Sequence, residues 1–333
     1  MAKEKEEPKP KRTVDVYLPF EQSIAELEKK IQELSAISDN GIELNDEIKD
    51  LKKKYDAALK DTFENLTPWQ HVQVARHPQR PYTLDYVNLI MEDFLEISGD
   101  RYFSDDKAII AGFARFGSYK VVVVGHQKGR GTKENVFRHF GSAHPEGYRK
   151  AIRVMKLGEK YKLPVITFID TPGAYPGIGA EERGQAEAIA YNLREMAALE
   201  VPIISIIIGE GGSGGALGIG VADRILMLEN SYYSVISPEG CAAILWKDST
   251  RAPDAAVALK ITAEALLEHK LIDDIIKEPL GGAHRDIDKT AKVLKEKLEK
   301  HLKELTILSK KELLEQRYQK YRIIGEYKEN EKK

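Results

Sequence analysis

Residues 203–216 read Ile-Ile-Ser-Ile-Ile-Ile-Gly-Glu-Gly-Gly-Ser-Gly-Gly-Ala. The β-branched run at 203–208 predicts a short buried strand. Five of the seven residues at 209–215 are glycine, and a helix is expected over about 213–222. This stretch therefore predicts a strand that ends in a glycine-rich turn and continues into a helix.

The same order occurs twice upstream. A strand at 165–169 precedes Asp-Thr-Pro-Gly-Ala-Tyr-Pro-Gly at 170–177, and a strand at 121–124 precedes Gly-His-Gln-Lys-Gly-Arg-Gly at 125–131. Helices are expected at 147–160 and 181–199, and a further strand at 225–228. Nearly all-apolar strands that alternate with helices predict an α/β sheet that is buried on both faces and joined by crossovers. The alternation alone suggests a doubly wound sheet.

The regions outside this sheet divide the chain further. Residues 1–12 carry five basic and three acidic side chains with two prolines, and we expect a disordered tail there. Residues 13–81 contain amphipathic helical patterns at 20–34 and 44–58, joined by a turn sequence at 38–41 and followed by a proline-containing connection that we expect to be irregular. The main domain is expected at 82–286 and a tail of helices at 287–333. The hairpin is too short to be stable alone, so it should pack on the main body or on a second chain.

The composition excludes several classes of protein. With 51 basic and 53 acidic residues the net charge is −2, which gives no overall field for nucleic acid or an anionic membrane, and neither partner is predicted. The single cysteine, Cys241, excludes a disulfide framework and a cysteine-rich metal site. No signal peptide is recognisable, and the longest apolar run, at 201–208, is too short to span a bilayer. We therefore expect a cytoplasmic protein.

The glycine-rich turns carry the main functional information. Ligands of open α/β sheets gather at the carboxyl ends of strands, and glycine lets backbone N–H groups approach them closely. A following helix N-terminus favours developing negative charge. We expect the amides of Gly211 and Gly212 to form an oxyanion hole for an enolate-like oxygen. Loss of one such donor typically raises the barrier by about 3–4 kcal/mol.

The third turn also matches two other motifs. Gly209, Gly211 and Gly214 fit the dinucleotide-binding fingerprint, with Glu229 at the end of the next strand. The pattern Gly-x-Ser-x-Gly at 211–215 fits the nucleophile elbow of serine hydrolases. Both patterns arise readily in so glycine-rich a segment, and neither explains the other two turns. Ser213 is better interpreted as a turn and N-cap residue.

Basic residues, the single cysteine and the histidines are further candidates for a functional role. Residues 126–156 contain eight Lys or Arg against two Glu, which indicates contacts to coenzyme A phosphates or an acidic partner, or else a solvated helix face. Lys128 and Arg130 are favoured as contacts because they follow a strand end. Cys241 is interpreted as a small packing residue. The eight histidines form no i, i+4 pair of the metal-binding type, so no metal is predicted.

Three long segments carry a family resemblance. Residues 164–177, 209–216 and Ser-Pro-Glu-Gly-Cys-Ala at 237–242 resemble the carboxyltransferase alpha subunits of the bacterial and plastid multisubunit acetyl-CoA carboxylases. The resemblance covers essentially the whole chain, including Pro-Tyr-Thr-Leu-Asp-Tyr at 81–86. It implies a crotonase-like (ClpP/crotonase) α/β fold, which is a spiral of β-β-α units, with an N-terminal helical hairpin and a C-terminal helical tail.

The resemblance also implies a reaction and partners. The family transfers a carboxyl group from carboxybiotin, on its carrier protein, to acetyl-CoA, and the product malonyl-CoA enters fatty-acid synthesis. Two copies of this chain would assemble with two beta subunits that carry a zinc ribbon, and biotin carboxylase would join the full complex. No cofactor would be bound covalently by this chain, and zinc is expected only in the beta subunit.

The family's functional residues map onto positions in this chain. The paired glycines whose amides meet the ureido oxygen of biotin correspond to Gly211 and Gly212, and Gly173 and Ala174 are expected to line the biotin pocket. The oxyanion hole for the acetyl-CoA enolate would belong mainly to the beta subunit, so neither chain should be active alone. The alternatives are an acyl-CoA hydratase or isomerase of the crotonase superfamily, with its own acid–base pair, and a non-catalytic scaffold subunit.

Overall fold

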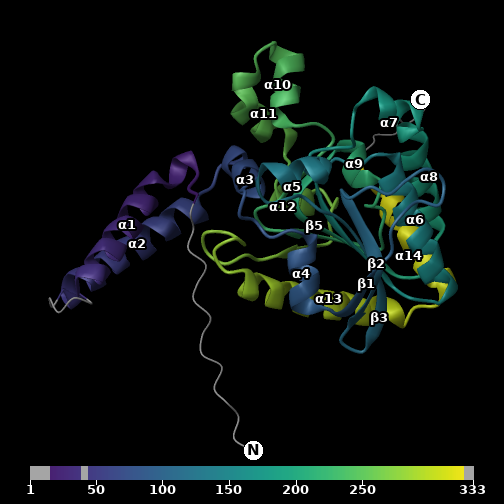
Figure 1. The fold of residues 1–333 in the computed structure, drawn as a ribbon, viewed down its shortest axis with the longest axis horizontal. Coiled ribbons are helices and arrows are strands. Elements are labelled where there is room, and N and C mark those ends of the chain that lie inside the picture. The colour runs from purple at the N-terminus through teal and green to yellow at the C-terminus, as the bar shows by residue number, and fades with distance from the viewer. Residues whose placement is uncertain (1–15, 39–43, 326–333) are drawn as a thin grey trace, which may run out of the picture.

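A single mixed sheet forms the centre of the molecule in the computed structural model, which describes residues 16–38 and 44–325 (Figure 1). Its strands are β1 (Glu92–Glu96), β2 (Ile109–Phe116), β3 (Tyr119–His126), β4 (Val165–Thr171), β5 (Ile203–Gly212), β6 (Arg224–Leu228), β7 (Tyr232–Ser234) and β8 (Asp274–Ile276). The spatial order is β1-β2-β3-β4-β5-β6-β8, and β7 pairs with the end of β5. The pairings β1–β2 and β2–β3 are antiparallel, and all pairings from β3–β4 onward are parallel.

The strand order decides between the two sheet topologies considered from the sequence. A doubly wound sheet reverses its strand order at a switch point. Here each strand from β1 to β6 lies beside its predecessor in the chain. The doubly wound sheet suggested by the alternation alone is therefore wrong, and the order is that of a β-β-α spiral.

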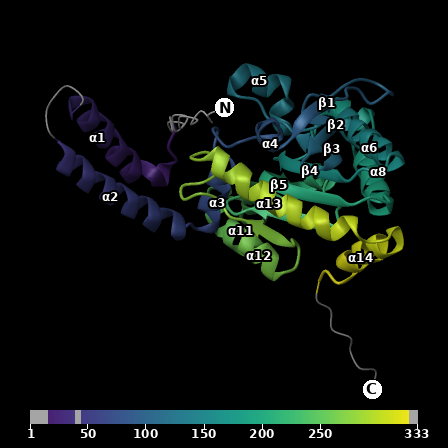
Figure 2. The same ribbon diagram turned by 90° about the horizontal axis from the view of Figure 1, so that it is seen from below.

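Both faces of the sheet are covered by helices, which explains why its strands are almost entirely apolar. On one face α6 (Pro145–Lys160) and α8 (Gln185–Ala198) pack against alternate residues such as Val122, Val165 and Ile203. On the other face α4 (Thr83–Ile90) and α13 (Ile287–Thr306) pack against Val123 and Ile166. Figure 2 shows α13 running across the sheet.

The two N-terminal helices, α1 (Gln22–Ser38) and α2 (Asn45–Glu64), lie side by side and project from the body (Figures 1 and 2). Their base is attached to the body through Arg285, which donates hydrogen bonds to Glu21 at 2.9 Å and to the Tyr55 hydroxyl at 3.1 Å. The tail predicted at 1–12 lies outside the described residues, as do residues 39–41 of the predicted turn.

The remaining helices refine the sequence-based expectations. They are η1 (Pro19–Glu21), α3 (Pro68–Ala75), α5 (Gly131–Phe137), η2 (His139–Gly141), α7 (Ile178–Glu182), α9 (Ser213–Leu217), α10 (Pro238–Trp246), η3 (Ser249–Arg251), α11 (Ala252–Leu259), α12 (Ala263–Glu268) and α14 (Lys310–Arg322). None of the helices in the described ranges is long and apolar enough to cross a membrane.

Three local expectations differ from the structure. The connection expected to be irregular contains α3, which begins at a capping box formed by Thr67 and Gln70 with Pro68 in the first turn. The single helix expected at 181–199 is two helices, because Gly184 adopts a left-handed conformation with φ +83° between them. The helix expected at 213–222 ends at Leu217.

Candidate functional site

The carboxyl ends of β3, β4 and β5 meet at one edge of the sheet, so the three glycine-rich turns come together. Thr171 pairs with Gly211 across the β4–β5 ladder. Gly209 lies so close to Asp170 that a Cβ atom placed on it would be 2.5 Å from the carboxylate oxygen Oδ1. The turns predicted from three separate parts of the sequence therefore form one site.

Glycine is required where the third turn touches the second. A Cβ atom on Gly212 would lie 2.2 Å from the carbonyl oxygen of Pro172, and one on Gly215 would lie 2.5 Å from the backbone nitrogen of Ala174. Gly214, in the same turn, would bring its Cβ only to 3.7 Å from Ile189. The close approach of the two turns thus depends on particular glycines rather than on the composition of the turn.

Gly211 and Gly212 are the last two residues of β5. Both are buried, and they pair with Tyr233 and Ser234 of β7. The chain then turns sharply at Ser213, whose φ of +49° is in the left-handed region that non-glycine residues rarely adopt. Ser213 and Gly214 are partly exposed, so the strand-to-helix turn reaches the surface there. Gly212, not Ser213, occupies the N-cap position of α9, so the predicted N-cap is wrong by one residue.

A buried ion cluster lies directly beneath the turns. The Nζ atom of Lys128 is 2.7 Å from Oδ1 of Asp170 and 2.7 Å from Oε2 of Glu210. Arg76 donates to the other oxygen of Glu210 at 2.8 Å, as does the hydroxyl of Tyr232. Lys128, Asp170 and Glu210 each belong to a different one of the three turns. Their ion pairs therefore link the three turns to one another.

Burial and pairing act differently on the members of this cluster. Burial, with the charge of Glu210 adding to it, raises the pKa of Asp170 although Lys128 lowers it. Burial alone would raise the pKa of Glu210, but the nearby Lys128 and Arg76 lower it to about 2. Burial also disfavours the charged form of Lys128, yet Asp170 and Glu210 outweigh it and raise its pKa above the usual range. The Lys128 ammonium therefore stays protonated and neutralised by carboxylates, which leaves it poorly suited to bind a phosphate directly.

Two arginines of the segment before the main domain, Arg76 and Arg80, contact the residues around the site. Arg76 also contacts Glu239 at 2.5 Å. Arg80 is almost completely buried, pairs with Glu278 at 2.5 Å and donates to the carbonyl oxygen of Ile208 at 2.7 Å. Neither arginine was predicted, because no sequence pattern connects them to partners more than 120 residues away.

The other predicted residues lie around the same edge. Gly173 and Ala174 are half-buried in the turn after β4, and the space where a Gly173 side chain would lie is open. Arg130 is exposed, contacts Asp85 at 2.6 Å and stacks over the ring of Tyr82. Cys241 packs in α10, away from solvent.

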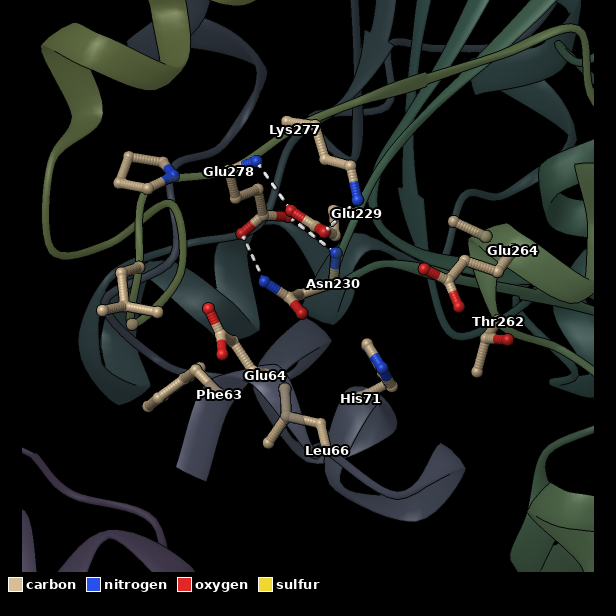
Figure 3. A pocket seen from close by; sticks show the side chains of 14 residues that line it. Phe63, Glu64, Leu66, His71, Glu229, Asn230, Thr262, Glu264, Lys277 and Glu278 are labelled. Carbon is tan, nitrogen blue, oxygen red and sulfur yellow. Dashed lines mark hydrogen bonds and ion pairs between the residues drawn. The ribbon is translucent and has the colours of Figure 1, made fainter. Parts of the chain in front are cut away.

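A separate cavity of about 540 Å³ lies beyond the ends of β6 and β8 (Figure 3). It is lined mainly by polar and acidic groups, including Glu229, Asn230 and Glu264, with His71 on its wall. Glu278 at its rim accepts hydrogen bonds from Asn230. None of the residues predicted to contact biotin, coenzyme A or the carrier lines this cavity, so it is distinct from the glycine turns. Glu229, noted above in the dinucleotide-binding motif, does line it.

Comparison with known proteins identifies close relatives of the chain. Residues 17–325 match the family described as acetyl co-enzyme A carboxylase carboxyltransferase-like. A protein of Geobacter metallireducens named acetyl-coenzyme A carboxylase carboxyl transferase subunit alpha is 60% identical over 94% of this chain and 98% of its own length. The protein of the same name from Actinobacillus succinogenes is 60% identical over 93% of this chain and 98% of its own length.

Solved structures establish the fold class. The transcarboxylase 12S structure with methylmalonyl-coenzyme A and methylmalonic acid has a TM-score of 0.52 at 19% identity and covers 65% of this chain and 41% of that chain. A Pseudomonas malonate decarboxylase hetero-tetramer in complex with coenzyme A has a TM-score of 0.53 at 15% identity, over 63% and 84% of the two chains. These neighbours confirm the predicted crotonase-like α/β fold.

Proposed function

Because the chain belongs to the family of acetyl-coenzyme A carboxylase carboxyl transferase alpha subunits, we propose that it carries the half of the active site that receives biotin. The chain is an alpha subunit of a multisubunit carboxyltransferase, and its reaction supplies fatty-acid synthesis. In this proposal the alpha subunit binds biotin, and the beta subunit mainly holds the acetyl-CoA enolate.

The proposed catalytic groups are the backbone amides of Gly211 and Gly212. Negative charge develops on the ureido oxygen when carboxybiotin gives up its carboxyl group, and amide donors held in place stabilise such charge without reorganising. The observation that carries this proposal is the position of both glycines at the end of β5, with Gly211 packed against Tyr233 of β7 and Gly212 against Pro172 of the neighbouring turn. The amides that open α9 lack partners within the helix, which adds favourable dipole at the same place.

The turn after β4 is the proposed wall of the biotin pocket. Gly173 leaves open space where a side chain would lie, and Ala174 is half-buried beside Gly215. Larger residues at these two positions would fill the space that the planar ring of biotin is proposed to occupy. Arg130, exposed at the end of the neighbouring turn, is the proposed contact to coenzyme A or the carrier. Lys128 is proposed to position both turns through its two ion pairs rather than to touch substrate.

If the site is shared between two kinds of subunit, the chain needs protein partners. We propose two beta subunits to two copies of this chain, with the acetyl-CoA enolate held mainly by the beta subunit and a zinc ribbon located there. The biotin would arrive on its carrier protein, with no cofactor bound covalently by this chain, and biotin carboxylase would complete the assembly. A cytoplasmic location is proposed for the complex.

The alternatives are not favoured. An acyl-CoA hydratase or isomerase needs its own acid–base carboxylate pair at the site. The two carboxylates nearest the turns, Asp170 and Glu210, are both buried and share the Lys128 ammonium, so neither is exposed to a substrate at the surface of the turns. A non-catalytic scaffold is not favoured because the relatives are named as carboxyl transferase subunits.

The reverse reaction tests the proposed division of the site. Biotin-dependent loss of the carboxyl group from malonyl-CoA is measured with this chain alone, with a beta subunit alone and with the mixture. Activity only in the mixture is expected. Activity of this chain alone would contradict a shared site, and an assembled but inactive mixture would favour the scaffold.

A further inference from the structure

Three side chains of metal-binding type meet outside the glycine turns: Asp106, His139 and His144. Asp106 lies shortly before β2, His139 begins η2 and His144 is the N-cap of α6. Each offers one potential ligand atom, and these atoms all lie within 4.8 Å of one another. The sequence predicted no metal because the two histidines lack i, i+4 spacing and the carboxylate is 33 and 38 residues away.

The spacing of the ligand atoms matches a small metal ion. Nδ1 of His139 is 3.2 Å from Oδ1 of Asp106, and Nδ1 of His144 is 3.5 Å from Oδ2. In a tetrahedral zinc site with bonds of about 2.0–2.1 Å, neighbouring ligand atoms are about 3.3 Å apart. The two measured distances run to different oxygens of the carboxylate and lie on either side of this value. Since the three ligand atoms all lie within 4.8 Å of one another, rotation of the side chains can bring them to the spacing of an ion.

The carboxylate is held in place before any ion arrives. The Asp106 side chain is only 1% exposed, and its oxygens accept hydrogen bonds from the backbone amides of Ala108 at 2.8 Å and His144 at 2.5 Å. Outer hydrogen bonds of this kind orient metal ligands and raise their affinity.

The two imidazoles are also positioned by their surroundings. His139 and the next residue, Phe140, both have positive φ, of 48° and 54°, and in this conformation the His139 ring contacts Asp106. The ring of His144 stacks on Tyr175 at 4.0 Å, and its buried Nδ1 has no hydrogen-bond partner. Side-chain exposure of 36% at His139 leaves an approach from solvent.

We propose that Asp106, His139 and His144 bind a divalent transition-metal ion of the zinc type. Two imidazole nitrogens and one carboxylate oxygen are the protein ligands, and water takes the remaining position, as in open zinc sites with three protein ligands. The site would brace the turn after β4, because the backbone amide of Tyr175 donates to the carbonyl oxygen of Ala143 at 3.0 Å. It does not depend on the proposed roles of the glycines.

The test is a titration of the full, untagged chain, without a beta subunit, with Co²⁺ and then Zn²⁺. One equivalent of Co²⁺ is expected to give visible d–d absorption without a thiolate charge-transfer band, since Cys241 is the only cysteine and packs in α10. Zn²⁺ should displace the cobalt and abolish the spectrum. The isolated chain avoids the zinc expected in the beta subunit.

Substitutions locate the ion. His139→Ala and His144→Ala should each weaken binding by at least about 100-fold, since even loss of an outer hydrogen-bond partner costs about 10–100-fold. His269→Ala, at an exposed histidine away from the cluster, is the matched control and should bind as the wild type. The proposal is overturned if the folded wild-type chain takes up no stoichiometric Co²⁺ or Zn²⁺. It is equally overturned if the two ligand variants bind as tightly as the control.

Discussion

Lys128 and Glu210 are joined by a 2.7 Å ion pair between the ends of β3 and β5, directly beside the Gly211–Gly212 pair. The bond ties the turn after β3 to the residue that precedes the proposed catalytic amides. Since Lys128 binds Asp170 through the same nitrogen, one buried ammonium fixes all three turns relative to one another.

Replacement of the buried ammonium should destabilise the fold. Lys128→Met leaves Asp170 and Glu210 buried without their shared cation, and breaking a buried ion pair in this way costs about 3–5 kcal/mol. The free energy of unfolding in urea measures the effect. Lys133→Met, at an exposed lysine nearby, is the control and should change stability by less than about 0.5 kcal/mol. Equal stability of the two variants would contradict the assigned role.

Acid should weaken the fold through buried histidine. Burial, with Lys128 adding to it, lowers the pKa of His126 to about 3 from 6.5. The unfolded chain therefore binds a proton below about pH 6.5 that the folded chain does not accept until about pH 3. The stabilising contribution is complete above pH 6.5 and falls as the pH decreases, by at most about 1.4 kcal/mol per pH unit.

A variant isolates this contribution. Between pH 7 and pH 5, His126→Gln should lose about 2 kcal/mol less stability than the wild type. His269→Gln, at an exposed histidine, should follow the wild-type pH dependence. Unfolding free energies at the two pH values provide the comparison, and identical slopes for all three proteins would refute a neutral buried His126.

Arg130 should affect substrate binding and not the chemical step. Arg130→Ala removes an exposed charge whose pairing with Asp85 contributes little to stability. Loss of a charged hydrogen bond to coenzyme A or the carrier should raise KM about tenfold while kcat stays unchanged. Steady-state kinetics with each substrate varied in turn distinguish the two partners. Lys133→Ala is the control, and an unchanged KM for both substrates would remove Arg130 from the site.

Strands β3 to β6 were predictable from sequence because they are β-branched or apolar runs, and β3, β4 and β5 end at glycine-rich turns. Strands β1, β2, β7 and β8 were missed. The order of the strands was not predictable, since a doubly wound sheet and a β-β-α spiral have the same local alternation. Only the family resemblance indicated the spiral, and the structure agrees with it. Short-range propensity likewise missed α3, where Thr67 caps a helix in a segment that its prolines made look irregular.

The glycines of the candidate site were predictable from the sequence, but the contacts of the charged residues that hold them in place were not. Turn glycines are visible in the sequence, but Arg76 reaches Glu210 across 134 residues, and Asp106 reaches His139 across 33. Such contacts depend on which strands become neighbours, and no spacing rule records them. The left-handed Ser213 was also missed, because its conformation is imposed by the crowded end of β5 and not by its own preference.

Paired glycine substitutions test whether the end of β5 provides the amides that stabilise the charge on biotin. Gly212→Ala would place a methyl group 2.2 Å from the Pro172 carbonyl oxygen, whereas Gly214→Ala would find only an ordinary contact at 3.7 Å. Both variants are assembled with the beta subunit, checked by gel filtration and thermal unfolding, and assayed for carboxyl transfer. Alanine keeps the backbone N–H but forces the backbone at residue 212 away from Pro172, which displaces the donor. Gly212→Ala should therefore assemble but lose at least about 100-fold in kcat, comparable to the loss of one oxyanion donor. Gly214→Ala should stay within about twofold of the wild type. Full activity of an assembled Gly212→Ala enzyme would contradict the account.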